Sequence, residues 1–191
     1  MKKKDIRDIF NEKRLQLNIE QIKKLNDQLL LQFQKLPIDI PALIMTYYPM
    51  KRLNEFDPQL VTDYCYFKNP GQQLSYPVIV EQGEKVEITA MVADDESLFE
   101  TNKYGIDEPV DGIDMFSSEI DMIIVPLLSF DKKGNCVGYG QGYYDRFLKL
   151  CRKDCLKIGF SYFDCIEKID DINKYDVKLN YCITPDRIFE F

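Results

Sequence analysis

Histidine is absent from this 191-residue chain, and no two of its six cysteines form a CxxC pair. Zinc sites usually draw on histidines or paired cysteines, so a zinc site is not expected. Without histidine, the usual general base near neutral pH is missing. Any catalysis must therefore rest on carboxylates, tyrosines, lysines, a metal or the substrate itself.

The chain also has no apolar run long enough to span a bilayer, and its first residues lack the apolar core of a signal peptide. Cys151 and Cys155 fall on one face of an expected helix and are interpreted as small buried residues in a reducing compartment. These features predict a soluble, cytoplasmic protein that does not bind a membrane.

Positive charge is outnumbered by negative charge: 25 lysines and arginines against 32 aspartates and glutamates give a formal net charge of −7. Affinity for nucleic-acid backbones needs clustered lysine and arginine, so a nucleic-acid binder is excluded. The exception is the N-terminus, where Lys2, Lys3 and Lys4 are followed by Arg7, Lys13 and Arg14. By itself this run is either a solvated charged surface or a site that attracts an anion.

The chain has enough apolar residues for a packed core, because 45% of its residues are hydrophobic and these include 12 tyrosines and 12 phenylalanines. That length and composition predict one domain over residues 1–191, and we expect a monomer.

A glycine-rich loop is the most informative motif. Gly138, Gly140 and Gly142 stand at every second position, after an apolar run at 121–130 and before helical spacing at 143–152. Backbone N–H groups of a glycine loop before a helix can close on a phosphate. The spacing matches neither the dinucleotide fingerprint nor the Walker loop. From the loop alone, a phosphate cradle and a plain tight turn remain equally open.

The rest of the chain alternates helical and strand patterns. Two helices are expected between residues 3 and 36, with Asn18 as the N-cap of the second, and another helix over 57–67. Buried strands are expected at 42–48, 74–81, 121–130 and 156–162, an antiparallel strand at 85–91, and a short closing strand at 187–190. Residues 97–114 are expected to be irregular. The sum predicts a single three-layer, Rossmann-like α/β domain, with a mostly parallel sheet and helices on both faces.

The order of several motifs resembles the 5-formyltetrahydrofolate cyclo-ligase family, also called methenyltetrahydrofolate synthetases. The matching segments, spread over nearly the whole chain, are Lys3/Lys4 to Arg7, Tyr47-Tyr48-Pro49 with Glu55-Phe-Asp57, Tyr104-Gly-Ile-Asp-Glu-Pro109, Val125-Pro-Leu-Leu-Ser-Phe-Asp131, Gly134, and Gly138 to Leu148. The Gly-Tyr-Gly-Gln-Gly-Tyr-Tyr-Asp-Arg block is the most specific of them.

The resemblance implies a reaction. ATP and Mg²⁺ would convert 5-formyltetrahydrofolate to 5,10-methenyltetrahydrofolate, ADP and phosphate, through phosphorylation of the formyl oxygen and ring closure by N10. Such a transfer depends mainly on positioning and charge neutralisation, and it needs no histidine.

The resemblance also assigns residues to roles, in four groups. The ATP contacts would be Lys3, Lys4, Arg7, Cys136, Val137, Gly138, Tyr139, Gly140, Gln141, Gly142, Tyr143 and Tyr144. The folate contacts would be Tyr48, Glu55, Tyr104 and Tyr143. Asp145 and Asn180 would ligate magnesium, and Tyr143 and Arg146 would be catalytic. Helical spacing turns Tyr144 inward and leaves Tyr143 the better placed to face substrate.

Two positions depart from the family pattern. Cys136 stands where an arginine is common before the first loop glycine, and Asn180 stands where a second acid is often found. These departures leave a catalytically weakened folate- or nucleotide-binding module as an alternative. A sugar-phosphate isomerase is a second alternative, which rests only on the similar α/β layout of such enzymes.

Overall fold

The structure, a computed structural model, describes residues 1–83, 85–94 and 96–191. Its helical elements are α1 (Lys3–Leu15), α2 (Ile19–Phe33), the 3₁₀ turn η1 (Lys51–Leu53), α3 (Gln59–Lys68) and α4 (Tyr143–Leu148). Its strands are β1 (Leu43–Met45), β2 (Gln73–Gln82), β3 (Lys85–Val92), β4 (Phe99–Thr101), β5 (Asp107–Pro109), β6 (Ile113–Met115), β7 (Met122–Val125), β8 (Ser129–Phe130), β9 (Cys136–Val137), β10 (Leu156–Phe160), β11 (Tyr181–Ile183) and β12 (Ile188–Glu190).

The two N-terminal helices form where the sequence predicts them. Asn18 accepts a hydrogen bond from the Gln21 backbone N–H at 2.9 Å, and the Gln21 side chain accepts one from the Asn18 N–H, also at 2.9 Å. This capping box satisfies two free donors at the start of α2. The predicted N-cap at Asn18 is confirmed.

One sheet of eight strands, in the order β12-β11-β10-β7-β1-β2-β3-β6, forms the middle of the molecule. Four of its seven strand pairings are parallel, from β11 through β2. After β1 the chain first adds β2, β3 and β6 on one side and then returns to add β7 on the other. The carboxyl ends of β1 and β7 thus flank the point where the strand order reverses, which is the usual place for ligands in such sheets.

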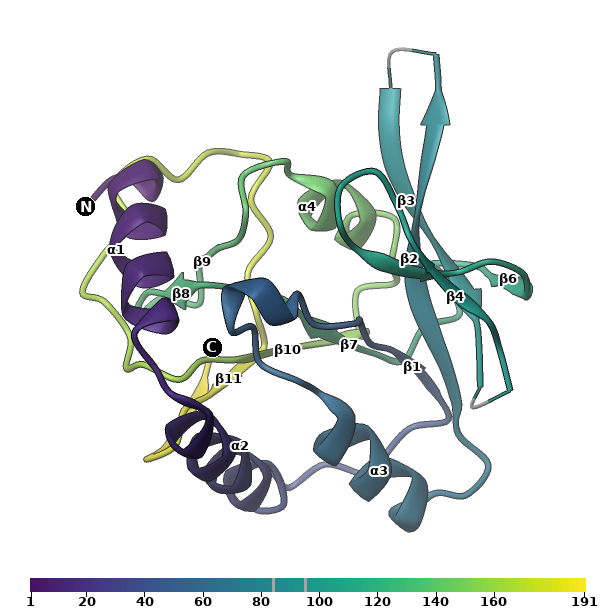
Figure 1. Ribbon diagram of the computed structural model, residues 1–191, viewed down its shortest axis with the longest axis horizontal. Helices are drawn as coiled ribbons and strands as arrows, with labels where there is room; N and C mark the ends of the chain where they lie inside the picture. Colours follow the sequence, from purple (N-terminus) through teal and green to yellow (C-terminus); the bar gives the residue numbers. More distant parts are fainter. Residues whose placement is uncertain (84, 95) are drawn as a thin grey trace.

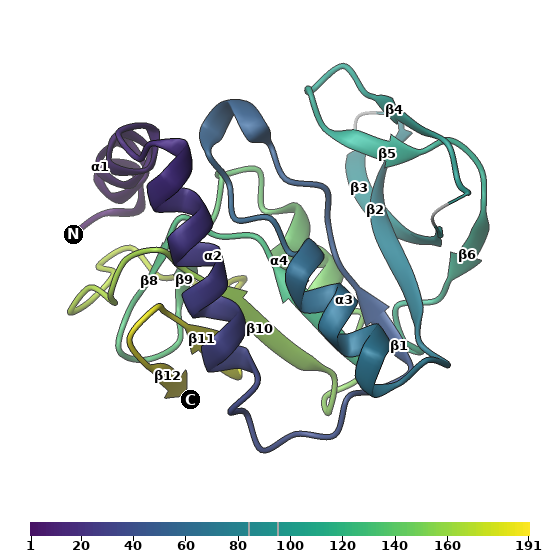
Figure 2. The same ribbon diagram turned by 60° about the horizontal axis from the view of Figure 1, so that its bottom comes forward.

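Helices cover both faces of this sheet, as predicted (Figures 1 and 2). Alternate residues of β7 point to opposite faces: Met122 and Ile124 pack in the cluster containing Leu29 and Phe33 of α2, whereas Ile123 packs in the cluster containing Phe147 of α4. The third cluster joins Ile6 and Phe10 of α1 to Val137 of β9. The fold prediction is confirmed, with α1 fixed beside the β8–β9 hairpin rather than over the main sheet.

Several predicted elements are shorter than their apolar patterns suggested. The strand expected at 42–48 is reduced to β1, and the one expected at 156–162 ends at Phe160. The run at 121–130 leaves the main sheet after Val125, because Pro126 has no N–H to continue the ladder and Leu128 N–H instead bonds Val137 O at 2.8 Å. The helix expected over 143–152 ends at Leu148 in a turn. Cys151 and Cys155 therefore do not share a helix face as predicted; both are free thiols near the start of β10.

Residues 97–114 are more regular than predicted. They contain β4 and β5, which pair with each other, and β6, which pairs with β3. Strands of three residues are too short to show a periodic pattern, so only pairing in the folded chain reveals them.

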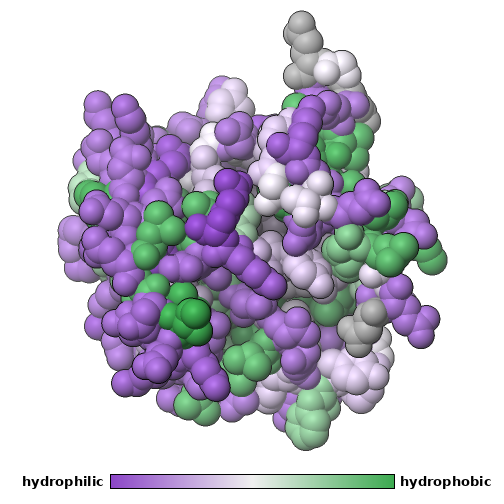
Figure 3. Space-filling model, viewed as in Figure 1, coloured by the Kyte–Doolittle hydropathy of each residue, from purple (hydrophilic) through white to green (hydrophobic). Residues whose placement is uncertain are grey.

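Hydrophilic side chains cover most of the face shown in Figure 3, and hydrophobic ones gather at the end that carries β6. Within residues 1–83, 85–94 and 96–191, no helix combines the length and the apolarity needed to cross a bilayer.

Candidate active site

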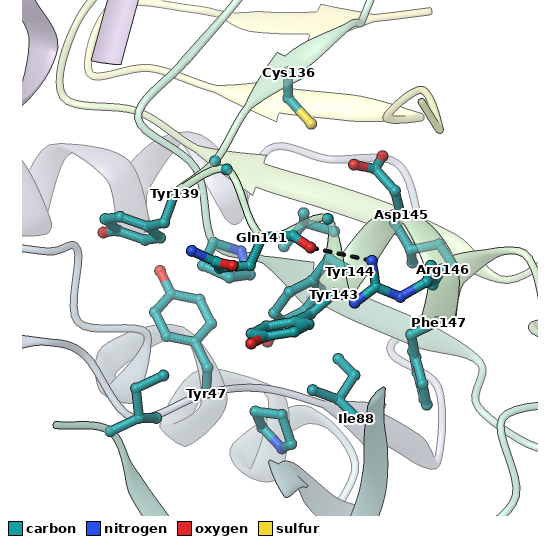
Figure 4. A pocket seen from close by; sticks show the side chains of 18 of the residues that line it. Tyr47, Ile88, Cys136, Tyr139, Gln141, Tyr143, Tyr144, Asp145, Arg146 and Phe147 are labelled. Atoms are coloured by element: carbon teal, nitrogen blue, oxygen red, sulfur yellow. Dashed lines mark hydrogen bonds between the residues drawn. The ribbon is translucent and has the colours of Figure 1, made fainter. Parts of the chain in front are cut away.

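A cavity of about 1070 Å³ opens at the edge of the sheet where the strand order reverses. It is lined by the segments that follow β1 and β7, by α1, by β2 and β3, by residues 136–150, and by residues 173–176 near the C-terminal end of the chain. Figure 4 shows the loop from Tyr139 to Arg146 on one side of this space and Tyr47 and Ile88 on the other. Segments distant in sequence therefore build one site.

The glycine loop is held by two arginines. Arg7 of α1 donates from Nε to Gly138 O at 2.8 Å. Arg146 of α4 donates to Gln141 O at 3.1 Å and to Val86 O of β3 at 2.9 Å. Gly140 has a φ of +98°, which residues with a Cβ rarely adopt, and a Cβ there would lie 3.1 Å from Cζ of Arg7. The loop thus presents its backbone close to a fixed guanidinium.

An acidic corner lies beside this loop. Asp145 accepts a hydrogen bond from Val177 N–H at 3.0 Å, and the Lys3 ammonium contacts Asp176 Oδ1 at 2.6 Å, with both of those side chains largely buried. Burial raises the pKa of Asp145, and the neighbouring Asp176 charge adds to this. Cys136 lies near the same groups; burial, with the Asp145 charge, raises the pKa of its thiol to about 12, so the thiol is neutral at physiological pH.

A buried network forms the other polar end of the cavity. Glu55 is only 6% exposed; its Oε2 accepts from Met50 N–H at 2.8 Å and its Oε1 from the Tyr139 hydroxyl at 2.6 Å. The Tyr139 hydroxyl in turn accepts from Arg14 Nη2 at 2.5 Å. Burial raises the pKa of Glu55, against the lowering effects of these hydrogen bonds and of the Arg14 charge.

Tyrosine side chains surround this network. The Tyr47 hydroxyl donates to Phe56 O at 3.1 Å, whereas the Tyr144 hydroxyl is buried and has no hydrogen-bond partner among the described residues. The ring of Tyr143 lies 5.3 Å from the Arg146 guanidinium carbon. A buried hydroxyl without a partner is costly, and a ligand donor or acceptor in the cavity would satisfy it.

The far wall of the cavity is aromatic. The ring of Tyr48 packs against Phe99 with centroids 4.6 Å apart, and the Tyr104 hydroxyl donates to Glu81 at 3.0 Å. Arg52 Nη2 donates to Tyr104 O at 3.2 Å, which joins the turn after β1 to the turn between β4 and β5. A flat ring could stack on this wall while its polar edge faces Glu55.

Comparison with known proteins agrees with this geometry. The sequence model of the 5-formyltetrahydrofolate cyclo-ligase family matches residues 2–185. The chain belongs to this family. The predicted family resemblance is thereby confirmed.

Individual relatives match over shorter segments. The 5-formyltetrahydrofolate cyclo-ligase of Mycoplasma genitalium is 42% identical over 66 residues, which are 34% of this chain and 40% of that protein. The cyclo-ligase of Escherichia coli is 32% identical over 77 residues, 39% of this chain and 41% of that protein. The matched segments thus span about two-fifths of the length of these curated relatives.

Solved structures match over the whole fold. The 5,10-methenyltetrahydrofolate synthetase of Aquifex aeolicus superposes with a TM-score of 0.79 at 26% identity, covering 100% of this chain and 93% of that one. The synthetase of Mycoplasma pneumoniae gives a TM-score of 0.71 at 21% identity, covering 96% of this chain and 98% of that one, and supports the fold.

Most of the residues predicted from the cyclo-ligase resemblance line the cavity. They are Lys3, Arg7, Tyr48, Glu55, Tyr104 and every residue from Cys136 to Arg146. The structure does not bring Lys4 or Asn180 to them. Lys4 is exposed on α1, and Asn180 precedes β11, where its Oδ1 accepts from Lys157 N–H at 2.9 Å. Asn180 is thus at the amino end of the parallel strands, the sheet edge opposite the cavity.

The structure adds two residues to the candidate site that the sequence reasoning missed. Asp176, not Asn180, is the second carboxylate beside Asp145. Its sequence signal was its position four residues before Asn180, where the family resemblance led us to expect a metal ligand. Arg14 was interpreted only as part of a basic run, although Arg7 and Arg14 are two helical turns apart and so share a face of α1.

Proposed function

We propose that this protein is an ATP-dependent 5-formyltetrahydrofolate cyclo-ligase, which converts 5-formyltetrahydrofolate to 5,10-methenyltetrahydrofolate with release of ADP and phosphate. The observation that carries the proposal is that one cavity joins a glycine loop and two cations to a buried carboxylate and an aromatic wall. The glycine loop and the cations suit a nucleoside triphosphate, and the carboxylate and the aromatic wall suit a pterin ring.

The reaction proceeds in two transfers. The formyl oxygen attacks the γ-phosphorus of ATP, forming an O–P bond as the bond to the ADP oxygen breaks. N10 then attacks the formyl carbon and the ring closes. The bond from that carbon to oxygen breaks, and inorganic phosphate leaves with the oxygen and the proton that N10 gives up. Both steps need the reactants aligned and the phosphate charge neutralised, which fixed loops and cations provide.

The phosphates would lie against the glycine loop. Lys3 and Arg7 reach the cavity from α1, and Arg7 already contacts the loop through Gly138 O. Lys3 also lies close enough to Cys136 to lower the pKa of its thiol, against the raising effect of burial. Lys3 would therefore supply a cation near Cys136, the position where the family resemblance leads us to expect an arginine.

Magnesium would bind at the acidic corner. No group of three or more acidic or cysteine side chains among the described residues is arranged to enclose a metal. Mg²⁺ with a nucleotide, however, usually takes one or two carboxylates and completes its shell with phosphate oxygens and water. Asp145 and Asp176 fit that requirement. Bound there, the ion would offset the charge on the phosphates.

The folate would occupy the other half of the cavity. Glu55 is placed to accept hydrogen bonds from pterin N–H donors, and Tyr48, Tyr104 and Tyr143 line the space around it. Arg146 is proposed to act with Tyr143 at the boundary between the two halves, since it fixes the loop through Gln141 O and its guanidinium lies over the Tyr143 ring.

A product assay tests the proposal. Protein mixed with 5-formyltetrahydrofolate, ATP and magnesium should show the rising absorbance of the conjugated methenyl product, and omission of ATP should abolish it. Folded protein that gives no product under these conditions would contradict the proposal. Binding of the folate without turnover would instead indicate a binding module. Action in the cytoplasm as a monomer stays a prediction.

A further inference from the structure

Arg14 is a buried cation without a carboxylate in direct contact among the described residues. Only 4% of it is exposed. Its guanidinium donates to Leu53 O at 3.0 Å, to Leu127 O at 3.3 Å and to the Tyr139 hydroxyl at 2.5 Å. Burying a charge among neutral groups is costly, so this arrangement calls for a role beyond packing.

The bond between Arg14 and Tyr139 fixes the direction of a proton. A guanidinium can only donate, so the Tyr139 oxygen must accept from Arg14. The single hydroxyl proton of Tyr139 is then free to point to Glu55 Oε1, 2.6 Å away. Because Met50 N–H donates to Oε2, both oxygens of Glu55 are acceptors. The acceptor capacity that remains on this carboxylate belongs to the cavity that Glu55 lines.

We propose that Arg14 is a positioning residue for the folate site: acting through the Tyr139 hydroxyl, it holds Glu55 as an oriented hydrogen-bond acceptor for an N–H donor of the bound pterin. This inference rests on the proposed function. It assigns to Arg14, which does not line the cavity, a part in substrate recognition.

Among the described residues, Arg14 is also the cation whose charge lowers the pKa of Glu55. In that part of the chain, four tyrosines also interact electrostatically with Glu55: Tyr47, Tyr139, Tyr144 and Tyr162. Burial raises the pKa of each of these tyrosines, so they are neutral at physiological pH. Loss of Arg14 or of the Tyr139 hydroxyl removes an effect that lowers the pKa of Glu55 while leaving the raising effect of burial.

The sign of the pH effect follows. Recognition needs the ionised carboxylate, so affinity for the folate is lost as the pH falls through the pKa of Glu55. In Tyr139→Phe and Arg14→Gln the pKa of Glu55 is higher, so folate affinity is lost at a higher pH than in the wild type. A purely structural role would weaken binding without moving the pH at which it is lost.

The test measures 5-formyltetrahydrofolate binding by calorimetry and turnover across pH, for the wild type and the variants Tyr139→Phe, Arg14→Gln and Arg14→Lys. We expect Tyr139→Phe to weaken folate binding about tenfold, the value of one hydrogen bond to a charged group. The pH at which folate binding is lost should move upward. KM for ATP should change less than about twofold, because the lost hydrogen bond is made to Glu55 in the folate half of the cavity. Arg14→Lys, which keeps one donor and the charge, should fall between wild type and Arg14→Gln.

Tyr181→Phe is the matched control, because it also removes a tyrosine hydroxyl that donates to a glutamate, Glu190 at 3.3 Å, but on β11 and away from the cavity. It should leave binding and the pH profile unchanged. If Arg14→Gln does not fold, Tyr139→Phe decides, since it keeps the other Arg14 contacts.

Folded Tyr139→Phe with a wild-type pH profile and folate affinity would overturn the inference, as would equal losses for folate and ATP without a pH shift. A wild-type protein that binds the folate with the expected acid limb but makes no product would contradict the proposed function and leave the role of Arg14 supported. A folded wild type that neither binds nor turns over the folate would overturn both.

Discussion

The hydroxyls of three tyrosines that line the cavity differ in their hydrogen-bond partners. Tyr47 donates to Phe56 O and Tyr139 to Glu55, but the Tyr144 hydroxyl has no partner among the described residues. Helical spacing predicted that Tyr144 turns inward, and its ring does pack against the core cluster that contains Phe147. Tyr144 also lines the cavity, but its hydroxyl is buried in the free protein, so a bound ligand must reach inward to complete it.

Replacing Tyr144 by Phe should therefore separate stability from binding. We expect the free energy of unfolding of Tyr144→Phe to equal or exceed that of the wild type, because no protein hydrogen bond is lost and a buried hydroxyl without a partner is removed. Tyr47→Phe should lose about 1 kcal/mol, the usual net worth of such a bond. Chemical denaturation measures both, and calorimetry should show weaker 5-formyltetrahydrofolate binding in Tyr144→Phe. Equal loss of stability in the two variants would show that the Tyr144 hydroxyl is already satisfied in the free protein.

Among the elements, α1 connects the core to the cavity. Ile6 and Phe10 bury one side of the helix against the β8–β9 hairpin, while Lys3, Arg7 and Arg14 extend toward the glycine loop and the Glu55 network. The loop is therefore set by packing of a helix that lies more than a hundred residues earlier in the chain. Its conformation depends on glycine at Gly140, where the backbone approaches Arg7.

Gly140→Ala tests this dependence. A Cβ at φ +98° costs about 1–2 kcal/mol of backbone strain and would displace the Arg7 guanidinium from Gly138 O. We expect KM for ATP to rise about tenfold, the value of one charge-assisted hydrogen bond, with folate binding retained. The control is Gly71→Ala, where a Cβ would meet only Asn69 Oδ1, at 3.5 Å. Unchanged kinetics in Gly140→Ala would show that the glycine loop is only a turn and does not bind the nucleotide.

At the scale of the whole molecule, ligand binding should tie the chain ends together. The proposed phosphate and magnesium groups come from α1, from the glycine loop with Asp145 of α4, and from Asp176. A nucleotide would thus bridge three segments that already meet through contacts such as Lys3 with Asp176. Any ligand that binds only the folded state stabilises it in proportion to the logarithm of its concentration.

ATP with magnesium, at about one hundred times its dissociation constant, should raise the free energy of unfolding by about 2.7 kcal/mol. For a chain of this length that corresponds to an increase in Tm of roughly 5–10 °C. Thermal denaturation followed with and without EDTA measures the metal's share, and the chelator should remove most of the increase. The same gain in the double variant Lys3→Ala, Arg7→Ala would show that the nucleotide binds elsewhere.

Local signals in the sequence were sufficient for several features. The capping box at Asn18, the apolar spacing of α1 and α2, and the ordered motifs of the cyclo-ligase family depend on neighbouring residues or on their order, both of which are visible in one dimension. The boundaries of elements were less well predicted. The apolar run at 121–130 divides at Pro126, and the helix from Tyr143 ends after six residues. Backbone hydrogen bonds to distant segments set such boundaries, and the local sequence pattern does not reveal them.

By itself, therefore, the sequence determined the α/β class and the family, and through the family resemblance it named residues of which most line the cavity. Only the tertiary structure decided that Arg14 reaches Glu55 through Tyr139, and that Asp176 rather than Asn180 lies beside Asp145. The reason is physical: residue type and spacing fix which chemistry is available, but strand pairing and helix packing fix which side chains meet and which become buried.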